Sequence, residues 1–173
     1  MSIQNKATTR QEFDPDKYIM HDELQSAVEV AIALGQPLLL TGEPGTGKTL
    51  LARKVAHELH QSDDRFRKKP LVFYTKTTSA ARDLFYTYDS LAHFHDAQLK
   101  EKKDLNVETY IQYQALGQAI IDSKQKRSVV LIDEIDKADI EFPNDLLQEL
   151  ARVLEHRFGV DQDLADVVAH VIA

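Results

Sequence analysis

The sequence predicts one three-layer α/β/α domain built around a parallel sheet. Three short apolar runs, near Leu39, Val72 and Leu131, are typical of strands that are buried on both faces. Segments in which apolar residues recur at helical spacing separate these runs. Strands that alternate with helices favour a parallel sheet, because a parallel neighbour is reached through a crossover connection. The 173 residues suffice for one domain with a substantial core, but not for two.

The expected elements follow one another in a regular order. Residues 1–17 are polar and are expected to form a flexible arm. Asp22 is a candidate N-cap for a helix that Gly35 ends. The remaining predicted elements are a strand at 37–41, a helix around 51–59, a strand at 71–75, a helical stretch at 84–91, a helix at 111–120 and a strand at 128–132. With only three clear strands, the sheet is expected to be incomplete.

A glycine-rich loop joins the first predicted strand to the second predicted helix. It matches the phosphate-binding pattern G-x-x-x-x-G-K-[ST] at every position. Backbone N–H groups from Gly45 onward are expected to face the phosphates of a nucleoside triphosphate, at the positive end of the following helix. Lys48 is expected to reach the β- and γ-phosphates, and Thr49 to ligate Mg²⁺. The predicted binding residues are Gly42, Glu43, Pro44, Gly45, Thr46, Gly47, Lys48, Thr49 and Leu50.

A second candidate site lies where the third apolar run ends in Asp133 and Glu134. The carboxyl ends of parallel strands form the edge at which ligands bind in open α/β sheets. Asp133 is therefore expected to bind magnesium, directly or through a water molecule. Glu134 is a candidate catalytic base that polarises the attacking water, with Lys48 as the second catalytic residue.

The composition limits which classes of partner and which cellular location are expected. The net charge of -7 argues against a broad surface for nucleic acid or for an anionic membrane. The short basic clusters at 100–103 and 124–127 are interpreted as solvated charge. The absence of cysteine excludes disulfides and thiolate metal sites, and no apolar run approaches the length of a membrane span. The polar N-terminus shows no signal-peptide pattern, so a cytoplasmic location is expected.

Histidines and aromatic residues between the second and third apolar runs are weaker candidates. His93 and His95 are two residues apart, so they do not share one face of a helix, and a surface role is favoured over a metal site. Tyr86, Tyr88 and Phe94 are expected to pack against the core rather than to form an interaction surface.

Two classes of nucleotide-hydrolysing protein are disfavoured by what the sequence lacks. A GTP-binding protein should carry Asn-Lys-x-Asp well after the magnesium strand. The nearest string, at 136–139, begins with Asp and lies too close to Asp133. The string at 133–136 also fits a helicase pattern, but the second domain of a helicase has no room in this chain.

Taken together, residues 18–150 resemble the MoxR-like branch of the AAA+ ATPases, which have a P-loop NTPase core. The stretches that carry the resemblance are 37–49, 131–138 and 142–147, with weaker landmarks at 81–86 and 113–117. The resemblance implies that Tyr18, Ile19 and Met20 lie near the adenine of ATP. It also implies that the loop lysine and threonine hold phosphate and Mg²⁺, and that the two motif carboxylates serve the metal and the water.

The same resemblance implies partners. Members of this branch form nucleotide-dependent rings, often hexameric, that remodel or activate partner proteins, commonly together with von Willebrand A-type companions. The expected partners are therefore ATP or ADP, other subunits of the same protein, and a protein substrate. A membrane partner is not expected, and nucleic acid is disfavoured by the charge.

The C-terminal segment, residues 151–173, departs from the family pattern and is expected to be helical. Family members continue into a strand with a polar sensor residue, an arginine finger and a helical lid, and neither Arg152 nor Arg157 is assigned such a role. Helical spacing instead extends to Gly159, and a second helical pattern, favoured over a strand, covers 164–172. A truncated chain and a naturally reduced family member both remain open.

Three functions follow, in order of preference. The first is an ATPase module that hydrolyses Mg-ATP to remodel or activate partner proteins. The second is a nucleotide-dependent switch or scaffold that binds ATP without significant turnover. The third is a fragment of a nucleic-acid motor. The isolated chain is expected to hydrolyse ATP weakly, and to form small oligomers through terminal apolar residues such as Leu150 rather than a stable ring.

Overall fold

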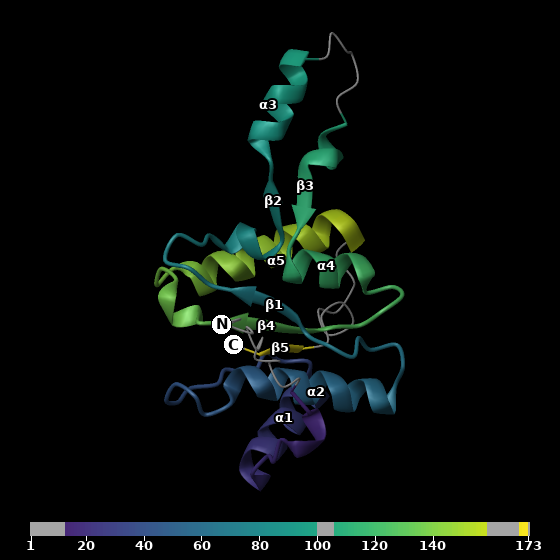
Figure 1. The fold of residues 1–173 in the computed structure, drawn as a ribbon, viewed down its shortest axis with the longest axis vertical. Coiled ribbons are helices and arrows are strands. Elements are labelled where there is room, and N and C mark those ends of the chain that lie inside the picture. The colour runs from purple at the N-terminus through teal and green to yellow at the C-terminus, as the bar shows by residue number, and fades with distance from the viewer. Residues whose placement is uncertain (1–12, 100–105, 159–169, 173) are drawn as a thin grey trace, which may run out of the picture.

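The centre of the molecule is a parallel sheet of three strands. The computed structural model describes residues 13–99, 106–158 and 170–172. The strands lie in the order β1 (Leu71–Tyr74), β4 (Val129–Asp133) and β5 (His170–Ile172). Figure 1 shows helices above and below this sheet, which makes three layers. The prediction of an α/β fold with a parallel sheet is therefore confirmed.

The middle strand, β4, carries the most deeply buried run of the chain. Its first four residues, Val129 to Ile132, are each at most 3% exposed. Val72 of β1 pairs with Leu131, and Ile172 of β5 pairs with Leu131 on the other side. A strand that is paired on both edges and covered by helices on both faces needs apolar side chains throughout, which explains its continuous apolar run.

Helices cover both faces of the sheet (Figure 1). On one face lies α2 (Lys48–Ser62), with α1 (Asp22–Leu34) outside it; Leu51 and Val55 of α2 pack against Val129 and Leu131. α1 begins directly after its N-cap, His21, and ends where Gly35 adopts the left-handed conformation, with φ of 62°. On the opposite face lie α4 (Ala115–Asp122) and α5 (Phe142–Phe158), which form the second half of the core.

An arm projects away from the layers between β1 and α4 (Figure 1). It comprises β2 (Tyr86–Tyr88), α3 (Ser90–Leu99), the 3-10 helix η3 (Val107–Tyr110) and β3 (Ile111–Tyr113). β2 and β3 form an antiparallel pair. Ile111, expected at the start of a helix, therefore lies in a strand, and the helix begins at Ala115 because the chain must first return from the arm.

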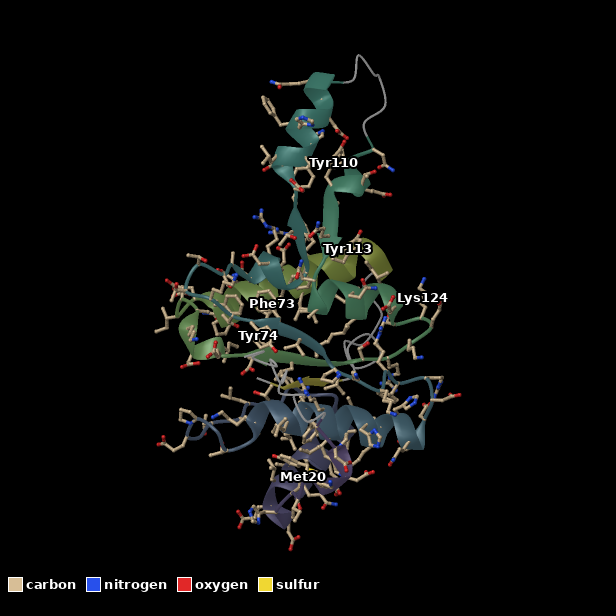
Figure 2. All side chains as sticks on the ribbon, viewed as in Figure 1. Met20, Phe73, Tyr74, Tyr110, Tyr113 and Lys124 are labelled. Atoms are coloured by element: carbon tan, nitrogen blue, oxygen red, sulfur yellow. The ribbon has the colours of Figure 1, made fainter. Side chains whose placement is uncertain are left out.

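The arm is held together by its own side chains. The Tyr88 hydroxyl and His93 Nδ1 are 2.5 Å apart, and the Tyr110 hydroxyl donates to Asp96 at 2.9 Å. Figure 2 shows Tyr110 within the arm, well away from the sheet. The expectation that Tyr88 and Phe94 pack against the core is wrong, since Phe94 is 61% exposed and Tyr88 39%. Tyr86, at the base of the arm, does pack against the core.

Two strand and helix predictions need correction. Residues 37–41 form no strand beyond a single bridge at Leu38, and Leu39 is 66% exposed. An apolar run becomes a strand only where successive residues find partners, and this segment pairs at one position. At the other end, His170 to Ile172 form β5 instead of the end of a helix. A short apolar run is compatible with both the helical and the strand periodicity, and here the pairing with β4 makes it a strand.

The helical prediction for the segment before residue 159 is confirmed by α5. Leu150, expected on an exposed oligomerisation face, is 8% exposed and belongs to the core beside α4. Leu150 is buried because it lies on the apolar face of α5, which packs against the sheet. Three predicted features lie largely or wholly outside the described residues. They are the flexible N-terminal segment (1–12 of 1–17), the basic cluster at 100–103 and residues 164–169 of the second helical pattern.

Candidate nucleotide-binding site

The glycine-rich loop before α2 adopts a backbone that only glycine tolerates easily. Gly42, Gly45 and Gly47 have φ values of 148°, 84° and 88°. A Cβ atom added to Gly45 would meet nothing within 4 Å, so the loop is open on that side. Gly47 caps α2, and its carbonyl accepts the N–H groups of Leu50 and Leu51. The loop thus turns its backbone toward the N-terminal end of a fifteen-residue helix, which favours anions.

Lys48 is the first residue of α2, and its side chain folds over the loop. Its Nζ donates to the carbonyl oxygens of Gly42 at 2.5 Å and Glu43 at 3.0 Å. The Thr46 hydroxyl donates to the same Glu43 carbonyl at 2.9 Å. The two bonds from Lys48 hold its side-chain ammonium group against the loop, where a triphosphate is expected.

Thr49 and Asp133 meet at the end of β4. The Thr49 hydroxyl donates to Asp133 Oδ2 over 3.0 Å, and both side chains are partly buried. In Figure 1 the loop before α2 and the turn after β4 lie at the same end of the sheet, on the left of the view. A hydroxyl and a carboxylate side by side are the oxygen ligands that Mg²⁺ prefers. The two predicted metal ligands are therefore neighbours in space.

Glu134 has the only positive φ among the described residues other than glycine, with φ of 59° and ψ of 40°. It caps the 3-10 helix η4 (Ile135–Lys137). In a 3-10 helix, residues three apart lie on the same side, and Lys137 Nζ accordingly approaches Glu134 Oε2 to 2.6 Å. Strained backbone of this kind is concentrated at functional sites. The candidate base is thus held by a lysine that its own motif supplies.

The three residues assigned to the adenine by resemblance have different surroundings. The Tyr18 hydroxyl donates to the Gly47 carbonyl at 3.3 Å, and burial raises the pKa of Tyr18. Ile19 is 85% exposed. Met20 lies between α1 and α2 (Figure 2), at a groove of about 270 Å³ that Val28 and Leu59 also line. Of the three, Tyr18 is the one that contacts the phosphate loop.

Sequence patterns did not reveal two further residues at this edge. Thr75, directly after β1, is 2% exposed and donates its backbone N–H to the Asp133 carbonyl at 2.9 Å. Its hydroxyl is buried without a hydrogen-bond partner. The second residue is Lys137, whose ion pair with Glu134 depends on the turn that η4 makes. A polar residue at the end of an apolar run was the available signal for Thr75.

Other candidate sites receive no structural support within the described residues. In this part of the chain, no group of three or more histidine, aspartate and glutamate side chains is placed to hold a metal ion. His93 instead contacts Tyr88 and Tyr110 in the arm. The helices described here also lack the combination of length and apolar character that a membrane span requires.

The comparison with protein families agrees with this geometry. A family model described as AAA domain matches residues 33–165, which include the glycine-rich loop, β4 and α5. No curated protein matches the sequence. The match covers more than half of the chain and contains Lys48, Thr49 and Asp133. The chain therefore belongs to the AAA domain family, and is an AAA+ P-loop NTPase.

Proposed function

We propose that this chain binds Mg-ATP at the loop of residues 42–49 and hydrolyses it as a MoxR-like AAA+ module that acts on partner proteins. The observation that carries the proposal is the contact between Thr49 and Asp133. It unites the end of the phosphate loop with the end of the buried strand β4. Without that contact the two motifs would be separate sequence patterns.

The residues present fit a magnesium nucleotide. The open side of the loop at Gly45 leaves room for phosphate oxygens against backbone N–H groups. Lys48 would exchange its two carbonyl partners for phosphate oxygens, which are stronger acceptors for an ammonium ion. Thr49 and Asp133 would hold Mg²⁺. Bound Mg²⁺ neutralises negative charge on the phosphates and so favours attack by water.

Glu134 is the proposed general base, since it follows the metal-binding carboxylate directly. Its role would be to orient a water molecule and accept its proton. The ion pair with Lys137 engages Oε2 of this carboxylate at 2.6 Å, which leaves Oε1 to accept a hydrogen bond from the water. Both side chains are about half exposed, and exposed ion pairs contribute only about 0–1 kcal/mol, so the pair opens readily.

The MoxR-like assignment, the protein partner, ring assembly and a cytoplasmic location are parts of this proposal that rest on the sequence resemblance. A second candidate is a nucleotide-dependent switch that binds ATP with little turnover. The Glu134–Lys137 pair is the observation that bears on this candidate, because it engages one oxygen of the proposed base and can slow turnover only modestly. A motor acting on nucleic acid has no comparable observation in its favour.

Titration with a fluorescent ATP analogue, followed by phosphate release, tests the proposal. Lys48→Ala should lose at least about tenfold in affinity, because the loop loses its cation. Lys68→Ala is the control, since Lys68 is an exposed lysine before the start of β1, whereas the phosphate site lies near the ends of β1 and β4. Equal affinities of the parent and Lys48→Ala would refute the nucleotide site. Tight binding without phosphate release, with or without added protein partners, would favour the switch.

A further inference from the structure

The segment that precedes α1 lies against α2, the helix that begins at the glycine-rich loop. Its 3-10 helix, η1 (Pro15–Lys17), contacts α2, and Asp16 Oδ1 lies 3.8 Å from His57 Nε2 of that helix. Tyr18 and Met20, which follow η1, pack against the apolar cluster that α2 shares with β4. The segment is therefore held on the helix at more than one point.

Tyr18 reaches from this segment to Gly47, the residue that caps α2. The tyrosine hydroxyl donates to the Gly47 carbonyl at 3.3 Å. The tyrosine ring covers the α-carbon of the glycine, because a Cβ atom added there would lie only 3.1 Å from Cε2 of the ring. Glycine thus suits position 47 for two reasons: its φ of 88° is costly for other residues, and a side chain would displace the ring.

This contact acts on the peptide group between Gly47 and Lys48. The Gly47 carbonyl also accepts the N–H groups of Leu50 and Leu51, both at 3.0 Å, so it points along α2. In a trans peptide the N–H points opposite to the carbonyl, and none of the described peptide bonds is cis. The Lys48 N–H is therefore directed away from the helix and toward the loop. As one of the first four N–H groups of α2, it has no acceptor within the helix.

We propose that Tyr18 is a positioning residue of the phosphate site, which holds the Gly47–Lys48 peptide so that the Lys48 N–H faces the bound phosphates. The inference rests on the proposed function, since it requires a triphosphate in the loop. An amide that is aimed before the ligand arrives need not be ordered during binding, and this raises the affinity. Tyr18 thus acts on the phosphates through Gly47, a role distinct from contact with the adenine.

Two ligands that share a triphosphate separate these roles. Inorganic triphosphate has the phosphate chain without adenosine, and ATP has both; calorimetric titration in excess Mg²⁺ measures each affinity. Tyr18→Phe keeps the ring and removes the hydroxyl. It should weaken both ligands by about threefold, which is the modest effect of one neutral hydrogen bond. Tyr18→Ala also removes the ring from Gly47 and should weaken both by about tenfold or more.

The matched control is Tyr110→Phe, which removes a tyrosine hydroxyl that donates to Asp96 at 2.9 Å on the arm. It should bind both ligands like the parent. Protein labelled with ¹⁵N-lysine adds a direct readout of the amide. Saturating inorganic triphosphate should shift the Lys48 amide resonance in the parent and in the control, and should shift it less in Tyr18→Phe. Circular dichroism verifies that each variant is folded.

Equal losses for the two ligands and a smaller Lys48 shift, with an unchanged control, support the proposal. A loss confined to ATP overturns it and places Tyr18 at the adenosine. Unchanged affinities in both Tyr18 variants, or an unchanged Lys48 shift in Tyr18→Phe, overturn it and leave the nucleotide site intact. Equal losses in Tyr18→Phe and Tyr110→Phe also overturn it, because the lost hydroxyl then has only a general structural effect. If the parent binds neither ligand, the proposed function fails and the inference fails with it.

Discussion

Thr49 donates a hydrogen bond to Asp133 although the two residues are 84 positions apart in the sequence. Thr49 lies in the first turn of α2 and Asp133 is the last residue of β4, so the bond links the helix to the middle of the sheet. Leu51 and Val55 pack on the same strand and fix the helix in this register. The two proposed magnesium ligands are thereby positioned by the core rather than by a mobile loop.

Asp133→Asn should weaken the magnesium-dependent part of ATP binding by about tenfold or more. The amide oxygen can still accept the Thr49 hydroxyl, but the charge that attracts the cation is removed. Titrations of a fluorescent ATP analogue, in excess Mg²⁺ and in chelator, measure this part directly. Asp139→Asn, beyond η4, is the control. If Asp133→Asn keeps the full magnesium effect, Asp133 is not a metal ligand.

Glu134→Gln should leave ATP binding intact while phosphate release falls by roughly 10²–10⁴-fold, which is typical of a lost general base. The substitution keeps the shape of the side chain but removes its negative charge, and with it both the ability to accept a proton and the ion pair with Lys137. Phosphate release under single-turnover conditions is the measurement, and Glu108→Gln on the arm is the control. Turnover equal to that of the parent would remove Glu134 from the proposed mechanism.

Lys137→Gln should raise phosphate release by at most about fivefold, because it frees the Glu134 carboxylate from an exposed ion pair worth about 0–1 kcal/mol. ATP affinity should not change, since the pair does not touch the loop that binds phosphate. In the Glu134→Gln background the same substitution should have no effect on turnover. A decrease in turnover would instead mean that Lys137 positions Glu134 for its reaction.

The sequence predicted those parts of the site whose residues are adjacent in the chain. The glycine pattern of residues 42–49 and the apolar run before Asp133 each carry their own local signal. Their approach in space followed from the expectation that strand ends share one edge of a parallel sheet. Thr75 was missed because its proximity to Asp133 depends on the register between β1 and β4, which no local pattern encodes.

The errors in the fold have the same origin. Leu39 and Ile172 lie in apolar runs of similar character, yet only Ile172 belongs to a paired strand. Partners that are distant in the sequence decide which run becomes a strand. Tyr88 and Phe94 are apolar enough for a core, so the sequence favours packing of this segment on the sheet, yet both side chains are exposed. Instead, β2 and β3 carry α3 out of reach of the sheet (Figure 1).

Alkaline pH should destabilise the protein through Tyr18 and Tyr110. Burial raises the pKa of both hydroxyls above the ordinary value of 10.0, and for Tyr110 the hydrogen bond to Asp96 adds to the rise. A raised folded-state pKa gives stability that is fully present below the unfolded pKa and is lost as pH rises through the folded value. Urea midpoints from about pH 9 to about pH 11 should therefore fall. Tyr18→Phe and Tyr110→Phe should each flatten the decline, and an unchanged slope in both would contradict this origin.

Gly117→Ala should destabilise the chain, although alanine is the better helix former. Gly117 is buried in α4, and an added Cβ would overlap the backbone carbonyl of Phe85 at the base of the arm. A free helix position would gain up to about 1 kcal/mol from the substitution. Overlap with backbone, which cannot rotate away, should instead cost at least about 2 kcal/mol and lower the Tm by about 4–8 °C. The sign of the change in a thermal melt is therefore diagnostic, and a stabilised variant would show that α4 and Phe85 are not in contact.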